Sequence, residues 1–184
     1  MIRLFIAVPI PENIRNLIEG LVSELQGVPG LPKDIRFVPP ENWHFTLTFL
    51  GYQNESAIPF VENSIRLLFH SNVLQNIRIE FERLIYGPVN RAPRMLWLTT
   101  SKRTSEELGR IKKSLEDELE SKGVKWQREL RPYQAHLTLA RFEPVPAKNL
   151  PKIERELGWE YETKEIHLMK SVLKRTGAEY EILL

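Results

Sequence analysis

Cysteine is absent from this chain, which excludes disulfide bonds, thiolate catalysis and cysteine-based zinc sites. Long hydrophobic runs are absent too, and no apolar stretch approaches the roughly 20 residues that a membrane helix needs. The net charge is only +2, well below that of a protein that coats nucleic acid. These absences predict a cytoplasmic protein that does not enter a membrane. If the protein handles RNA, we expect it to grip an end rather than a long tract.

The length and composition of the chain are typical of one large domain or of two small lobes that share a core. It has 184 residues, of which 42% are hydrophobic and 27% are charged. The apolar start, Met1–Val8, is too short for a signal peptide and is interrupted by Pro9 and Pro11. A buried first strand is therefore expected there.

A short pattern occurs twice, as His44-Phe45-Thr46-Leu47 and as His136-Leu137-Thr138-Leu139. Each copy lies in an alternating run that is typical of a β-strand. Because side chains alternate along a strand, each histidine shares a face with the threonine two positions later. In the first copy, Thr48 is expected on that same face and Phe49 on the opposite, apolar face.

The elements around the two copies also follow a similar order. Helices are predicted at 12–26, 57–69, 104–122 and near 150–157, and a capping box at Thr104 opens the third of them. Strands are predicted at 35–38, 44–50, 77–86, 94–99 and 135–140, and Gly51 ends the second of them. A closing hairpin of 161–173 and 178–184 is predicted to turn at 175–177. The spacing between the histidines also lays Leu4-Phe5-Ile6 on Leu96-Trp97-Leu98. We therefore predict a single domain, 1–184, with duplicated halves of roughly 1–90 and 91–184. Its fold class is α+β, with two lobes that each contribute one histidine strand and face each other across a groove.

Two histidines on opposite sides of a cleft can supply a general base and a general acid. In-line displacement at phosphorus needs that arrangement, because the nucleophile and the leaving oxygen lie on opposite sides. The Thr46 and Thr138 hydroxyls can donate hydrogen bonds to non-bridging phosphate oxygens. The carboxylates near these strands do not form a ligand cluster with the histidines, so no metal is expected. One His-x-Thr is usually structural, but two copies in corresponding places favour a function.

The flanks of the two copies carry a resemblance. Several segments of the chain resemble the RNA 2′,3′-cyclic phosphodiesterases, historically called 2′-5′ RNA ligases. These enzymes belong to the two-histidine phosphoesterase superfamily. The segments are Arg3-Leu4-Phe5-Ile6-Ala7, Phe37-Val38-Pro39, Asn42-Trp43-His44, Phe49-Leu50-Gly51, Ala140-Arg141, Ser171 and the ending from Gly177 to Tyr180. The chain departs from the family at Ala135 and Ala178, where proline is frequent. Both departures concern backbone stiffness rather than chemistry. The resemblance implies a bilobal α+β fold, in which two antiparallel sheets flanked by helices line a central cleft.

The resemblance implies roles for two further residues. Arg141 becomes a phosphate ligand, with a solvated arginine at a strand end as the alternative. Strict alternation would place Arg141 on the apolar face, so for that role the strand must end or bulge before it. The equivalent position after the first copy is Phe49. Phe5 becomes an aromatic ring that stacks on a base, with a core phenylalanine as the alternative.

The predicted function is therefore metal-independent hydrolysis of RNA 2′,3′-cyclic phosphate ends to 2′-phosphomonoesters, with His44 and His136 as the acid–base pair. A reversible 2′-5′ ligation is implied as well. The expected partners are such RNA ends or small nucleotides, without a cofactor, and the expected state is a monomer. The alternatives are another two-histidine esterase that acts on cyclic nucleotides or 2′-5′ oligonucleotides, and a non-catalytic nucleotide- or RNA-binding module.

Overall fold

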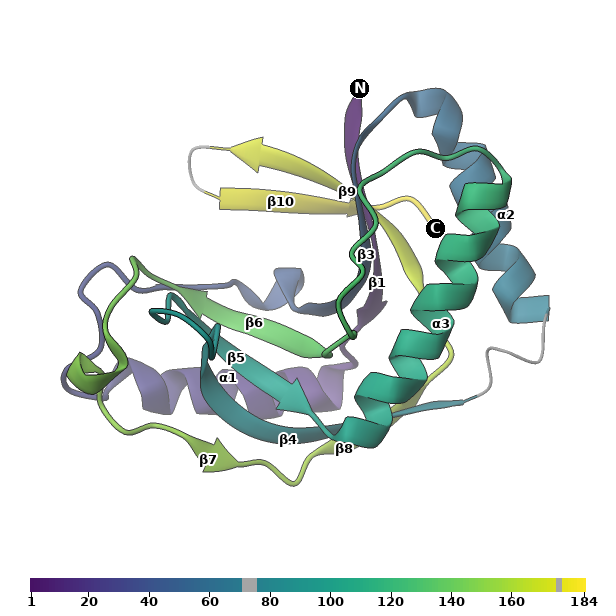
Figure 1. The fold of residues 1–184 in the computed structure, drawn as a ribbon. Helices are drawn as coiled ribbons and strands as arrows, with labels where there is room; N and C mark the ends of the chain where they lie inside the picture. The colour runs from purple at the N-terminus through teal and green to yellow at the C-terminus, as the bar shows by residue number, and fades with distance from the viewer. Residues whose placement is uncertain (71–75, 175–176) are drawn as a thin grey trace.

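The computed structural model describes residues 1–70, 76–174 and 177–184. Within these ranges the chain forms two antiparallel β-sheets and three α-helices (Figure 1). The strands are β1 (Ile2–Pro9), β2 (Arg36–Phe37), β3 (His44–Gln53), β4 (Ile77–Gly87), β5 (Met95–Thr100), β6 (His136–Arg141), β7 (Arg155–Glu156), β8 (Glu160–Thr163), β9 (His167–Lys174) and β10 (Gly177–Ile182). The helices are α1 (Glu12–Gln26), α2 (Ile58–His70) and α3 (Lys102–Ser121). The predicted α+β class with two antiparallel sheets is confirmed.

Each sheet combines strands from distant parts of the chain. The smaller sheet has the order β10-β9-β1-β3, and the larger has the order β2-β6-β5-β4-β7, with β8 paired to β4. Strand pairing therefore crosses the predicted boundary between halves near residue 90. Buried apolar side chains from both sheets form one continuous cluster. The two strands that carry the histidines, β3 and β6, belong to different sheets of this common core.

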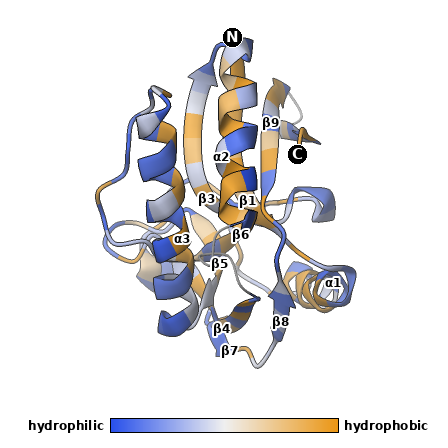
Figure 2. Ribbon diagram, turned by 90° about the vertical axis from the view of Figure 1, so that its right-hand side faces the viewer, coloured by the Kyte–Doolittle hydropathy of each residue, from blue (hydrophilic) through white to orange (hydrophobic). Residues whose placement is uncertain are grey.

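The helices cover the sheets through apolar stripes. Helix α1 buries Ile14, Ile18, Leu21 and Leu25, one per turn, and ends before Gly27 as predicted. Helices α2 and α3 pack against each other on one side of the molecule, apart from α1 (Figure 2). None of the helices in the described ranges is long and apolar enough to cross a membrane.

Helix α3 begins earlier than the sequence predicts. The Ser101 side chain accepts a hydrogen bond from the Thr104 N–H at 3.2 Å, so Ser101 is the N-cap and the predicted capping box at Thr104 is wrong. The Thr104 hydroxyl instead donates to the Arg78 carbonyl and accepts from the Glu80 N–H, both at 3.1 Å. Thr104 therefore fixes the first turn of α3 to strand β4.

Three other predicted elements differ from the structure. Gly51 does not end its strand; it has a φ of +68° in an irregularity where β3 runs past Leu4 and Phe5. The helix predicted near 150–157 is wrong, because residues 155–156 pair with β4 as strand β7. The single strand predicted over 161–173 divides into β8 and β9, because β4 and β1 each bind one part of it. Residues 175 and 176 of the predicted hairpin turn lie outside the described ranges.

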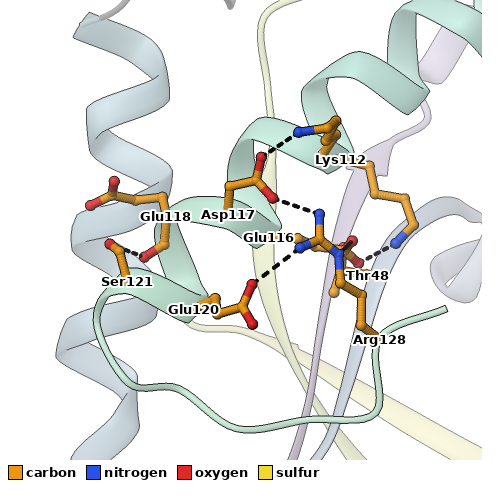
Figure 3. Close-up of polar contacts among 9 residues, drawn as sticks. Thr48, Lys112, Glu116, Asp117, Glu118, Glu120, Ser121 and Arg128 are labelled. Atoms are coloured by element: carbon orange, nitrogen blue, oxygen red, sulfur yellow. Dashed lines mark hydrogen bonds and ion pairs between the residues drawn. The ribbon is translucent and has the colours of Figure 1, made fainter. Parts of the chain in front are cut away.

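A buried ionic cluster joins α3 to the first histidine strand (Figure 3). The Glu116 side chain is only 4% exposed. Its carboxylate pairs with the Lys112 ammonium, accepts from Arg128 Nε at 2.9 Å and accepts from the Thr48 hydroxyl at 3.1 Å. Thr48 belongs to β3, and Arg128 belongs to the segment between α3 and β6. The Glu116 carboxylate therefore connects the first histidine strand to the segment that leads into the second.

Candidate active site

A cavity of about 870 Å³ opens between the two sheets. It is lined by every residue that the sequence predicts for the site: Phe5 from β1, His44 and Thr46 from β3, and His136, Thr138 and Arg141 from β6. The other two histidines, His70 and His167, lie outside it. The fold therefore brings together two strands whose histidines are far apart in the chain.

In both histidine strands, the last residue of the repeated pattern is an extra residue against the neighbouring strand. In β3, Thr46 lies opposite Ala7 and Thr48 opposite Ile6, so Leu47 is extra. In β6, Thr138 and Ala140 lie opposite Trp97 and Leu96, so the extra residue is Leu139. These β-bulges reverse the alternation of the residues that follow them.

The bulges decide which side chains enter the cavity. Arg141 lines the cavity, so the prediction that the strand bulges before it is confirmed. The predictions for Thr48 and Phe49 are wrong for the same reason. Thr48 is buried at 3% exposure against Glu116, whereas Phe49 lines the cavity at 45% exposure. The two bulges therefore place an aromatic ring after His44 and a guanidinium after His136.

Backbone carbonyls fix the orientation of both imidazole rings. His44 Nδ1 lies 2.8 Å from the Asn42 carbonyl oxygen, and His136 Nδ1 lies 2.9 Å from that of Gln134. Because a carbonyl oxygen only accepts, each Nδ1 carries a proton, and each neutral ring keeps its lone pair on Nε2. The Thr46 hydroxyl lies 3.0 Å from His44 Nε2 and can donate to it. Both rings are thus ready to accept a proton at Nε2.

Burial lowers the pKa of His44 and of His136 below the ordinary value of 6.5. The hydrogen bonds to Asn42 and Gln134 oppose that effect on the pKa of each ring, while the Arg141 guanidinium lowers both pKa values further. Both rings are therefore neutral in the free protein at pH 7. One of them must gain a proton before it can act as a general acid.

Each imidazole also contacts an aromatic ring. The Phe5 ring lies 4.9 Å from His44, and the Trp97 ring lies 4.2 Å from His136, measured between centroids. Phe5 and Trp97 occupy the same position when the two copies are aligned by the spacing between their histidines. Phe5 is only 3% exposed, because its ring packs against the rings of His44 and Tyr180 instead of facing solvent. A Cβ on Gly87 would collide with the Trp97 ring, so glycine there makes room for the indole.

Sequence reasoning missed several residues of the cavity. Arg3 lies over the Phe49 ring at 4.6 Å and donates to the Ser171 hydroxyl at 3.4 Å. Arg36 also lines the cavity. Trp97 is not among the residues that line the cavity, but its contact with the His136 ring could have been found, because the spacing of the repeat places Trp97 on Phe5. No comparable signal marks Arg36, whose place depends on pairing between β2 and β6.

The described residues contain no group of three or more histidines, aspartates and glutamates placed to hold a metal ion. What the cavity does present is two imidazoles, two threonine hydroxyls and the guanidinium groups of Arg3, Arg36 and Arg141. Such a set can bind an anion and exchange protons on opposite sides of it.

Comparisons with known proteins agree with this geometry. The profile of the family described as LigT like Phosphoesterase matches residues 8–95 and 98–180. The chain is 30% identical to the RNA 2′,3′-cyclic phosphodiesterase of Archaeoglobus fulgidus, over 98% of this chain and 97% of that protein. It is also 30% identical to the protein of the same name from Methanocaldococcus jannaschii, over 98% of both. The crystal structure of TT0787 from Thermus thermophilus superposes with a TM-score of 0.77 at 26% identity, and the match covers 99% of this chain and 95% of that one.

Proposed function

This chain belongs to the LigT-like phosphoesterase family, and we propose that it is an enzyme that hydrolyses RNA 2′,3′-cyclic phosphate ends to 2′-phosphomonoesters. The observation that carries the proposal is the meeting of two imidazoles from different sheets in one cavity, each with Nδ1 held by a carbonyl. The names of the relatives from A. fulgidus and M. jannaschii give the same reaction class.

In this reaction one imidazole accepts a proton from water at Nε2 while the water oxygen attacks phosphorus. The bond from phosphorus to the 3′ oxygen breaks, and the other imidazole, in its protonated form, gives that oxygen a proton. The products are a 2′-phosphomonoester and a free 3′ hydroxyl. Thr46, Thr138 and Arg141 are proposed to hold the non-bridging oxygens, whose charge grows during the attack. If a 5′ hydroxyl attacked the cyclic phosphate in place of water, the bond from phosphorus to the 3′ oxygen would break in the same way and a 2′-5′ bond would form; this ligation stays a prediction.

A product assay tests this proposal. With an oligoribonucleotide that ends in a 2′,3′-cyclic phosphate, we expect only the 2′-phosphate product, separated from the 3′ isomer by chromatography. The same rate is expected in excess EDTA, because proton transfer by imidazoles needs no metal. Binding of this RNA without turnover would instead select a non-catalytic module, and loss of turnover in EDTA would show a metal-dependent reaction.

The pH dependence of kcat/KM follows from the two lowered pKa values. Turnover needs one neutral and one protonated imidazole, and that form is most abundant between the pKa values of the pair. Because both lie below 6.5, we expect a bell-shaped profile with its maximum below pH 6.5 and a fall at higher pH as the general acid loses its proton. Initial rates from pH 4.5 to 8.5 at constant ionic strength measure it.

The Arg141 guanidinium provides a check on the cause of this shift. It lowers the pKa of both imidazoles, so Arg141→Gln should move the maximum to higher pH, whereas Arg141→Lys, which keeps the positive charge, should not. A wild-type maximum at or above pH 7 would contradict the expectation.

A further inference from the structure

Two arginines lie directly opposite each other at the rim of the candidate site. Arg36 of β2 pairs with Arg141 of β6 in an antiparallel register, and both line the cavity. Directly opposite residues project from the same face of a sheet, with Cβ atoms about 4.5–5.5 Å apart, and like charges placed in this way repel each other. The arrangement costs stability unless an anion lies between the two guanidinium groups.

Neither guanidinium is neutralised by a carboxylate in the described ranges. The side-chain partner of Arg141 is the Met95 sulfur at 3.5 Å, and the Arg36 side chain has none among these residues. Carboxylates are present in the same cavity wall, at Asp34 and Glu143. The Asp34 carboxylate, however, accepts the Glu143 N–H at 2.6 Å instead of pairing with either arginine.

Several other arginines of this chain form ion pairs with glutamates, as arginines with a structural role do. Arg78 pairs with Glu160, Arg128 with Glu116, and Arg155 with Glu24. Arg36 and Arg141 differ from these because neither pairs with a carboxylate in the described ranges, they lie opposite each other, and both line the cavity. Guanidinium groups of this kind are the preferred partners of phosphate oxygens.

The two arginines lie on different strands of the larger sheet. Arg141 lies on β6, the strand that carries His136, and its guanidinium lowers the pKa of both His44 and His136. Arg36 lies on β2, one strand farther out at the edge of that sheet. An anion at Arg36 is thus a neighbour of the reacting phosphate rather than the reacting phosphate itself.

We propose that Arg36 binds the phosphodiester on the 5′ side of the terminal nucleotide, and thereby makes the site selective for RNA ends over cyclic mononucleotides. The inference rests on the proposed function, since it takes the reacting phosphate to lie between the imidazoles and Arg141. A free 2′,3′-cyclic nucleotide carries only that one phosphate. An RNA end carries a second phosphate one nucleotide away, which the outer guanidinium can reach.

Three substrates test the proposal: 2′,3′-cyclic AMP, the dinucleotide ApA with a 2′,3′-cyclic end, and the same dinucleotide with an uncharged methylphosphonate linkage. With wild-type protein, kcat/KM should be highest for the charged dinucleotide. Arg36→Ala should lower that value about 10-fold, the effect of losing one hydrogen bond to a charged group. The loss for the other two substrates should be much smaller. Arg36→Lys should retain part of the preference, and the preference should weaken as salt is raised.

Arg91→Ala is the matched control, because Arg91 is an exposed arginine outside the cavity; it should leave all three rates as in the wild type. An equal loss on all three substrates, or no loss on any, overturns the role of Arg36. If the wild type turns over none of them, the proposed function fails. Arg36 is then judged by the Kd of ApA carrying a 2′-phosphate, and an equal Kd for wild type and Arg36→Ala overturns its role as well.

Discussion

His136→Ala should lower the rate of cyclic-phosphate hydrolysis at least about 10²–10⁴-fold, and His44→Ala should do the same. Each variant removes one of the two groups that exchange a proton on opposite sides of phosphorus. If both imidazoles act in the same step, the double variant should be little slower than either single one, because groups that act as a unit are not additive. Single-turnover kinetics with a cyclic-phosphate RNA measure all three.

The folded state of these variants must be shown separately. His44 contacts Phe5 and Tyr180, and His136 contacts Trp97, so alanine also removes packing. His136→Gln and His44→Gln restore most of the volume without a group that titrates near neutral pH, and they should be as inactive as the alanine variants. His70→Ala, at an exposed position at the end of α2, is the control and should retain full activity. Turnover within a few-fold of wild type in either glutamine variant would refute the acid–base pair.

Glu116→Ala should lower the free energy of unfolding by about 3–5 kcal/mol, the usual cost of removing one partner of a buried ion pair. The Lys112 residue is only 8% exposed, so its ammonium group would remain buried without a carboxylate. The Thr48 hydroxyl would lose its acceptor at the same time, and Arg128 would lose one of its three carboxylate partners. Urea denaturation followed by circular dichroism gives the change. Because Thr48 lies two residues after Thr46, some loss of activity should accompany the loss of stability.

Asp117→Ala is the matched control for this prediction. Asp117 is the next residue on α3 and also pairs with Arg128, at 2.7 Å, but its side chain is 47% exposed. Exposed pairs contribute about 0–1 kcal/mol, so this variant should unfold almost like the wild type. A Glu116→Ala variant that is equally stable would show that the buried pair contributes nothing net to the fold.

The sequence predicts the reacting groups well because they depend on short patterns. The period of a strand is enough to place His44 with Thr46 and His136 with Thr138. The role that the family resemblance implies for Arg141 conflicts with that period, so the strand is expected to end or bulge before it. All six predicted site residues line one cavity. Their roles in binding and catalysis stay predictions that the variants above test.

What the sequence does not reveal depends on contacts between distant residues. The same bulge occurs in the first copy, but Thr48 and Phe49 are compatible with either face until Glu116 on α3 is known to accept from Thr48. Residues 155–156 form a strand rather than a helix because the edge of β4 is free to bind them. Arg36 is an ordinary surface arginine in the sequence, and only the register with Arg141 makes it part of the cavity.

The position of β1 has a consequence for how the chain folds during synthesis. This first strand lies between β3 and β9, with Arg3 opposite Ser171. One edge of β1 therefore lacks its partner until residues 167–174 have left the ribosome, and pairing over so long a separation is slow. An unpaired strand edge is a template for aggregation. A nascent chain that stalls before β9 should therefore be aggregation-prone, even though both histidine strands have already been made.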